Sequence, residues 1–268
     1  MRDMDDVLGK TDWAAAWRGL VEARVAFSGP RTGYWDRRAA SYAASMTRRR
    51  DGVLEFLEQW LSPTATLIDV GAGTGRFAAP LADRLEWVTA VEPSDGMRAL
   101  IPHRDNMTVI ASGWEEAEVA PADFVLCSHV LYGVADVVPF LRKLETAARR
   151  RVFVVLRARQ LGDAPDRVAL ALNLGRPRQP ELLDLLLVLR QLGVDYELSS
   201  VRYAVEYRYA SFEDAVDDCR GSLGGAWDDK LGREWLESNL KPDPEGGLLD
   251  WRGEMVSGVV HWQPTASS

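Results

Sequence analysis

Cysteine, histidine and long apolar stretches are all scarce in this chain of 268 residues. The two cysteines, Cys127 and Cys219, lie far apart, which excludes a disulfide framework and a cysteine-based metal site. The most apolar window, residues 182–192, contains two charged residues and is too short to span a bilayer. The first ten residues are polar and acidic, unlike a signal peptide. We therefore expect a soluble, cytoplasmic protein with no membrane partner and no metal site.

Positive charge is also in short supply. The chain has 32 Lys and Arg against 40 Asp and Glu, a formal net charge of −8. Proteins that bind nucleic acids derive much of their affinity from clustered cations. The basic runs at residues 48–50 and 149–151 fall at expected helix ends, where cations complement the exposed carbonyl groups. The composition therefore argues against a nucleic-acid partner.

A regular alternation of strand and helix patterns occupies the middle of the chain. Helices between the strands indicate a parallel sheet covered on both faces. The expected strands are residues 66–70, 87–91, 107–111, 123–128 and 151–156. Three helices are expected before them, within residues 11–61. After them we expect a mixed segment at 161–180, helices at 181–192, 211–220 and 228–240, a turn at 241–247, and strands at 194–209 and 251–262.

The most informative segment is the turn after the first strand. It contains Gly71, Gly73 and Gly75, with Asp69 at its start. Glycine permits backbone angles and close ligand approach that other residues prevent. The dinucleotide fingerprint G-x-G-x-x-G/A requires a small residue at its sixth position, where this chain has Arg76. A second acidic residue, Glu92, follows the second strand about 20 residues after the first glycine, the spacing at which a carboxylate accepts ribose hydroxyls.

These ordered motifs resemble those of the class I S-adenosylmethionine (SAM)-dependent methyltransferases over roughly residues 34–262. The resemblance implies a doubly wound, seven-stranded, mostly parallel α/β sheet whose last strand is antiparallel near the edge. N-terminal helices (1–62) would cap the cofactor site, and residues 63–160 would form the SAM-binding core. Residues 161–268 would supply a substrate-binding helical and strand insertion after strand five and complete the sheet.

The resemblance also implies how the cofactor is held. Asp69 helps to hold the ammonium of SAM, the glycine-turn backbone carries its amino-acid end, and Glu92 accepts hydrogen bonds from the ribose diol. Met97 packs near the adenine, and Arg38 pairs with the methionine carboxylate. The further cofactor-binding residues expected are Ala72, Phe77, Pro93 and Ser128.

Adenine recognition has more than one candidate. Relatives commonly place an Asp after strand three, where this chain has Gly113. The adenine would then be recognised by backbone atoms, by Trp114 or by Glu115. Trp114 either stacks on the purine or packs in the core beneath the loop.

On the acceptor side, the resemblance assigns Tyr34, Trp35, Tyr42 and Tyr132 to the substrate region. The first two are aromatic side chains that attract a sulfonium through cation–π interaction. His129 follows strand four at the carboxyl edge of the sheet, where open α/β sheets bind ligands. It is either a general base or a residue that shapes the pocket.

The predicted reaction is direct in-line methyl transfer to a small-molecule acceptor. The apolar helices of the second half and the tyrosines at positions 203, 207 and 209 favour a small organic acceptor. The chain lacks the Asn/Asp-Pro-Pro-aromatic and Pro-Cys motifs of nucleic-acid methyltransferases. A protein acceptor stays open. The alternatives are a non-catalytic protein that binds SAM or S-adenosylhomocysteine, and a NAD(P)-dependent oxidoreductase. No feature predicts the oligomeric state.

Overall fold

A computed structural model describes residues 9–29, 33–46, 52–158, 162–244 and 246–264. The basic run at 48–50 lies outside these ranges. The strands are β1 (Thr66–Val70), β2 (Trp87–Val91), β3 (Met107–Ile110), β4 (Ala122–Ser128), β5 (Ala148–Arg157), β6 (Glu197–Tyr209), β7 (Lys241–Pro242) and β8 (Leu248–Trp262). The helices of the first half are α2 (Trp13–Ser28), α3 (Tyr34–Met46), α4 (Gly52–Glu58), α5 (Ala78–Ala82), α6 (Asp95–Arg98), η1 (Leu131–Gly133) and α7 (Val137–Ala147). Those of the second half are α8 (Ala164–Ala171), α9 (Leu182–Gln191), α10 (Phe212–Leu223), η2 (Gly224–Ala226) and α11 (Asp229–Asn239).

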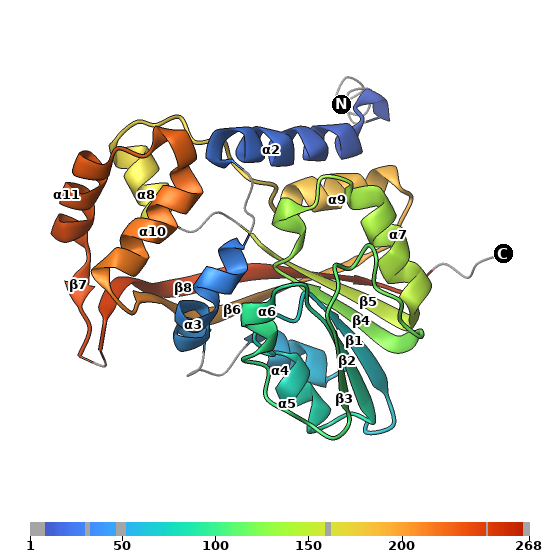
Figure 1. Cartoon of the computed structure of the whole chain (residues 1–268). Coiled ribbons are helices and arrows are strands. Elements are labelled where there is room, and N and C mark those ends of the chain that lie inside the picture. The colour runs from blue at the N-terminus through green and yellow to red at the C-terminus, as the bar shows by residue number, and fades with distance from the viewer. Residues whose placement is uncertain (1–8, 30–32, 47–51, 159–161, 245, 265–268) are drawn as a thin grey trace.

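One mixed sheet organises the molecule (Figure 1). Its strand order is β3-β2-β1-β4-β5-β8-β6, and the first five strands of this order are parallel. Strand β8 lies between β5 and β6 and is antiparallel to both. The predicted fold class, a mostly parallel α/β sheet, is confirmed. The two-residue β7 pairs with β8 off this path, within the segment expected to be a turn.

Alternating side chains of the central strands fill two cores, one on each face of the sheet. Ile68 and Val125 pack with α2, α7 and α9 on one face. Leu67 and Phe124 pack with α4 and α5 on the other. Central strands buried on both faces explain why their sequences read as continuous apolar runs. Helices therefore cover both faces of the central strands.

Strands β6 and β8 extend beyond the carboxyl edge of the parallel strands as a two-stranded ribbon. Helices α8, α10 and α11 surround the far end of this ribbon in a third apolar core (Figure 1). Helix α8 falls in the segment expected to be mixed. Asp163 caps it by accepting a hydrogen bond from the Asp166 amide, and Pro165 occupies the first turn, where the missing amide hydrogen has no consequence. Pro165 is therefore compatible with the start of a helix.

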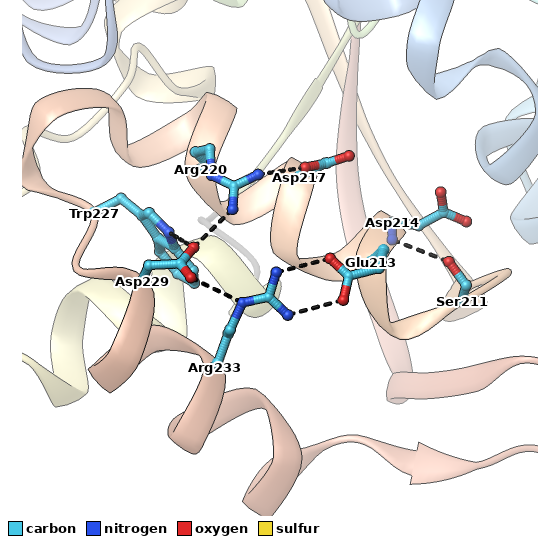
Figure 2. A network of polar contacts seen from close by, with 8 residues as sticks. All are labelled: Ser211, Glu213, Asp214, Asp217, Arg220, Trp227, Asp229 and Arg233. Atoms are coloured by element: carbon cyan, nitrogen blue, oxygen red, sulfur yellow. Dashed lines mark hydrogen bonds and ion pairs between the residues drawn. The ribbon is translucent and has the colours of Figure 1, made fainter.

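An exposed set of ion pairs, here called the α10–α11 network, joins two of these helices (Figure 2). Arg233 donates to Glu213 and Asp229. Arg220 donates to Asp217 and Asp229. Each arginine of the network thus contacts two carboxylates.

Two further findings concern the described residues alone. No helix in these ranges is both long and apolar enough to cross a membrane. Likewise, no group of three or more His, Cys, Asp or Glu side chains in the described part of the chain is arranged to hold a metal ion.

Candidate active site

The glycine turn connects β1 to α5 through three residues with positive φ, namely Gly71 (68°), Gly73 (57°) and Gly75 (80°). A Cβ on Gly71 would come within 2.4 Å of Val130, and one on Gly75 within 3.0 Å of Ile101. A Cβ on Gly73 would meet nothing nearer than the Tyr42 ring, at 4.0 Å. Protein packing therefore requires the first and third glycines, whereas the second borders open space.

Glu92 ties the end of β2 to this turn. One carboxylate oxygen accepts from the Gly73 amide at 2.8 Å and the other from the Ser94 amide at 2.9 Å. Burial raises the pKa of Glu92, and the two amide donors act in the opposite direction. Because each carboxylate oxygen has a second lone pair, both can still accept from a ligand hydroxyl.

Asp69 is the second buried acid beside the turn, with a relative exposure of 1%. One of its oxygens has no hydrogen-bond partner in the described structure. Burial raises the pKa of Asp69 to about 7, against the opposing effect of the Ala78 amide, and the charge of Glu92 adds to the rise. An unsatisfied buried carboxylate is costly unless a cation or donor completes it. Asp69 and Glu92 therefore fit a ligand that brings an ammonium and hydroxyl groups.

Helix α3 covers the turn. Asp36 accepts from the Ser94 hydroxyl at 2.6 Å and the Gly96 amide at 2.9 Å, which fastens α3 to the start of α6. The helices approach so closely that a Cβ on Gly96 would come 2.8 Å from the Asp36 backbone. This attachment sets Tyr42 opposite Gly73, while Trp35 is 46% exposed and contacts the Tyr42 ring edge-on.

Arg38 and Tyr34 turn away from the glycine turn toward α10. Both contact the buried Asp218, Tyr34 by a 2.8 Å hydrogen bond and Arg38 by a 3.4 Å ion pair. Tyr209 donates to the same carboxylate at 2.7 Å, and the Arg38 guanidinium lies over its ring. The predicted pairing of Arg38 with a methionine carboxylate stays a prediction, since one of its guanidinium nitrogens is buried without a hydrogen-bond partner in the described structure. Asp218, a buried acid distant in sequence, pairs with the arginine.

Two aromatic residues expected to touch the cofactor lie in the core. Trp114 is 3% exposed and donates to the Phe140 carbonyl at 3.4 Å beneath α7, so its core-packing alternative is the correct one. Phe77 is 5% exposed and packs with α4 and α5. The two rings belong to the cores on opposite faces of the sheet, where burial of their apolar surface stabilises the fold.

The remaining residues of the predicted cofactor set have mixed positions. Met97 is buried in α6, which Ser94 caps by accepting from the Met97 amide. Pro93 and Glu115 are exposed. Ala72 is buried within the turn, and the Ser128 hydroxyl is buried without a partner in the described structure. At Gly113, a Cβ would come 2.7 Å from the Glu116 carboxylate, so a side chain at this position would require the end of the flexible Glu116 side chain to move.

His129 has both ring nitrogens engaged by tyrosines. Nδ1 is 2.9 Å from the Tyr132 hydroxyl and Nε2 is 3.1 Å from the Tyr203 hydroxyl. The residue has a positive φ of 60°, an uncommon conformation for histidine. Burial lowers its pKa well below the usual value, and the charges of Arg157 and Arg76 add to the effect. The ring is therefore neutral near pH 7 and occupied on both sides, which favours a positioning role over general-base catalysis.

Arg157, which no sequence motif predicted as a site residue, completes this cluster. Its amide donates to the Tyr132 hydroxyl at 2.9 Å and its guanidinium donates to the Tyr207 hydroxyl at 3.1 Å. In the sequence, the signal that could have identified Arg157 was its position at the end of an apolar strand, the next strand along the chain after the one that leads to His129. Only the pairing of β4 with β5 identifies it as part of the site.

A mostly parallel sheet with a glycine turn at its carboxyl edge, and acids at the carboxyl ends of its first two strands, is typical of a protein that binds a nucleotide-like cofactor at that edge. The model of a methyltransferase-domain family matches residues 35–207, which include both acids, the glycine turn and Arg157. The chain belongs to this family of methyltransferase domains. The resemblance to class I SAM-dependent methyltransferases is therefore confirmed.

Individual relatives are distant. An uncharacterized protein of Haemophilus influenzae is 28% identical over 130 residues, 45% of this chain and 48% of its own length. The 23S rRNA (uracil(1939)-C(5))-methyltransferase RlmD of Tolumonas auensis is 31% identical over 121 residues, 38% of this chain and 26% of its own length. The chain thus spans no more than about half the length of these curated relatives. A structure of a putative methyltransferase from Bacillus halodurans shares the fold, with a TM-score of 0.52, 15% identity, and coverage of 79% of this chain and 99% of the other.

Proposed function

We propose that this protein transfers the methyl group of SAM directly to a small-molecule acceptor bound beside His129. The space at Gly73 carries the proposal. Of the three glycines in the turn, it is the one whose absent side chain would enter open space rather than protein. Tyr42 of α3 borders this space, and Glu92 accepts from the Gly73 amide beside it. Asp69, at the end of β1 before the turn, has a buried oxygen without a hydrogen-bond partner in the described structure.

The proposed cofactor contacts follow from these donors and acceptors. Asp69 pairs with the ammonium, and the backbone of Gly71 to Gly73 lies along the amino-acid end. Glu92 accepts from the ribose hydroxyls while it keeps the Gly73 amide in position. Met97 supplies an apolar surface near the base, and Ser128 offers a buried hydroxyl without a protein partner in the described structure.

SAM supplies a methyl group already activated on a sulfonium, so the protein mainly orients the acceptor and excludes water. Tyr42 on α3 and Tyr203 on β6 approach this part of the edge from two sides. The His129 ring fixes the hydroxyls of Tyr132 and Tyr203 in one network. These side chains restrict the position of an acceptor without forming a bond to it.

A small acceptor is favoured over RNA, although one distant relative is an rRNA methyltransferase. The formal net charge of −8 opposes a long phosphate contact. The acceptor side is closed by α3 and by the ribbon of β6 and β8, and its tyrosines suit a compact organic molecule.

The first test is ligand stabilisation of the purified protein by SAM, S-adenosylhomocysteine and NADH in parallel, measured as a change in melting temperature. Binding to the native state raises stability by mass action. We expect the first two to raise the melting temperature and NADH to leave it unchanged. Stabilisation by NADH alone would contradict the cofactor assignment.

The second test uses methyl-labelled SAM with a cell extract separated into small-molecule, RNA and protein fractions. We expect label in the small-molecule fraction with wild-type protein and none with Gly73→Val. Label that enters RNA or protein instead contradicts the acceptor class while it supports the methyltransferase activity.

A further inference from the structure

Arg157 occupies the acceptor side of the site. It ends β5, which lies beyond β4 from the glycine turn of β1. Neighbouring strands are about 4.8 Å apart, so two strand spacings set Arg157 roughly 10 Å across the edge from the turn. On its other side, Arg157 is opposite Ser257 of β8 in the antiparallel pairing. The part of β8 that precedes Ser257 extends past the edge as a ribbon with β6. The residue thus lies between the proposed cofactor position and the ribbon wall.

No carboxylate oxygen lies within 4.0 Å of the Arg157 guanidinium in the described structure. Its contacts are the Tyr207 hydroxyl at 3.1 Å and the Tyr132 ring at 5.6 Å, and its Nε is buried without a partner. The nearby acid Asp163 influences it from beyond ion-pair distance while capping α8. By contrast, Arg208 contacts both Glu206 and Asp243.

A second cation strengthens the positive potential at this point. Arg76 lies over the Tyr203 ring at 5.5 Å, and both arginines depress the pKa of His129 between them. Burial raises the pKa of Tyr207 to about 12, so its hydroxyl keeps the proton and can donate to a ligand. The surroundings of Arg157 therefore offer donors and positive charge, and among the described residues no carboxylate lies within ion-pair distance of its guanidinium.

Holding a guanidinium in such a position has a cost in folding free energy that a bound anion would offset. The planar fork of arginine matches a carboxylate by two parallel hydrogen bonds. The surrounding rings of Tyr132, Tyr203 and Tyr207 accommodate a planar organic molecule better than a polyanion, which would require several cations.

We propose that the acceptor is a small organic acid whose carboxylate binds Arg157 and the Tyr207 hydroxyl, and that Arg157 is the residue that selects it. This inference rests on the proposed methyltransferase function and specifies its substrate class. Arg157 is then a binding residue, and the methylated atom lies elsewhere on the same molecule, nearer to the glycine turn.

The test uses a panel of aromatic and aliphatic monocarboxylic acids, each with its matched primary amide, in the presence of saturating S-adenosylhomocysteine. Calorimetry measures the affinity of each pair. We expect at least one acid of the panel to bind, and its amide to bind roughly 10- to 100-fold more weakly. Arg157→Gln is expected to reduce the affinity for the acid by the same factor, and Arg157→Lys by less, since it keeps the charge but not the fork.

Two controls keep the outcomes distinct. Arg233→Gln, in the α10–α11 network, is expected to leave acid binding unchanged. Without ligand, the melting temperature of Arg157→Gln is expected to equal or exceed that of wild type, because the substitution removes a buried charge that has no ion pair. A variant that unfolds therefore contradicts the proposal. Equal binding of acid and amide, or no acid binding at all, also overturns it.

The cofactor carboxylate is another possible source of the anion, and S-adenosylhomocysteine affinity decides between the two. We expect this affinity to be the same in wild type and Arg157→Gln. A loss confined to the variant would mean that Arg157 holds the cofactor, which contradicts the acceptor assignment. Failure of S-adenosylhomocysteine to bind wild type would instead contradict the proposed function itself.

Discussion

The α10–α11 network and the carboxyl edge of the sheet use the same residue types in opposite ways. In the network, Arg233 contacts two carboxylates, and the pKa of its partner Asp229 is lowered to about 2, chiefly by hydrogen bonds from Arg220 and Trp227 (Figure 2). At the edge, Arg157 has no ion pair in the described structure, and burial raises the pKa of Asp69 to about 7. The network pairs its charges internally, whereas at the edge Arg157 has no ion pair and one oxygen of Asp69 has no hydrogen-bond partner in the described structure.

This difference predicts a separation of effects. Charged groups that are already paired within the protein contribute modestly to the stability of the fold and offer no unpaired charge to a ligand. Charges held without partners oppose folding and favour binding, as is common where stability and function conflict. Substitutions at the edge should therefore weaken ligand binding with little loss of stability. Substitutions in the network should change stability alone.

The largest effect is expected from Gly73→Val. The branched side chain fills the open space opposite Tyr42, so SAM binding should fall below detection in calorimetry. The substitution also imposes an unfavourable positive φ, which has a cost of about 1–3 kcal/mol. Gly193→Val is the matched control, because Gly193 has a similar φ of 70° and open surroundings far from the turn. Equal loss of SAM affinity in both variants would attribute the effect to backbone strain.

Asp69→Asn should change the pH dependence of stability. The folded pKa of about 7 lies above the ordinary 3.8, so folding favours the protonated form. The contribution of Asp69 to the free energy of unfolding is therefore fully present below about pH 4. It is lost as the pH rises through 7. The neutral amide should stabilise the free protein at pH 8 by about 1–3 kcal/mol and give no gain at pH 4. Denaturant unfolding at both pH values checks this, and SAM binding should weaken at the same time.

Glu92→Ala is expected to weaken SAM binding by about 1–3 kcal/mol, the usual range for hydrogen bonds to a charged acceptor. The loss includes the disturbed Gly73 amide as well as the ribose contacts. Glu213→Ala in the network is the control and should leave the affinity unchanged. A loss of no more than a few tenths of a kcal/mol in Glu92→Ala would indicate that another group holds the ribose.

The smallest effect is expected from Asp229→Asn, and the dependence of its stability contribution on pH is opposite to that of Asp69. Hydrogen bonds from Arg220 and Trp227 lower the folded pKa of Asp229 to about 2, below the ordinary 3.8. Its contribution is present above about pH 4 and is lost as the pH falls through 2. Because the group is exposed, the melting temperature at pH 7 should fall only slightly, and SAM affinity should not change. A large drop in affinity would break the proposed separation between the two regions.

Local patterns in the sequence were sufficient for the sheet and for part of the site. The strand expected at 194–209 corresponds to β6, and the strand expected at 251–262 to most of β8. The spacing of Asp69, the glycines and Glu92 predicted that they would meet, since the carboxyl ends of neighbouring parallel strands lie at one edge. Turn chemistry and strand periodicity involve residues close together in the chain, so they can be read without a structure.

The partners of polar and aromatic side chains could not be read in this way. Arg38 takes Asp218, which lies far along the chain, and Trp114 enters the core beneath α7 instead of meeting a purine. Arg157 remains without an ion pair in the described structure although acids are plentiful in the sequence. Such choices depend on which distant groups compete for one buried position and on the cost of leaving each unsatisfied. The chain therefore specified the strands, the glycine turn and its two acids through short-range chemistry. Folding in three dimensions settled which charges would be paired within the protein and which would be left without an ion pair among the described residues.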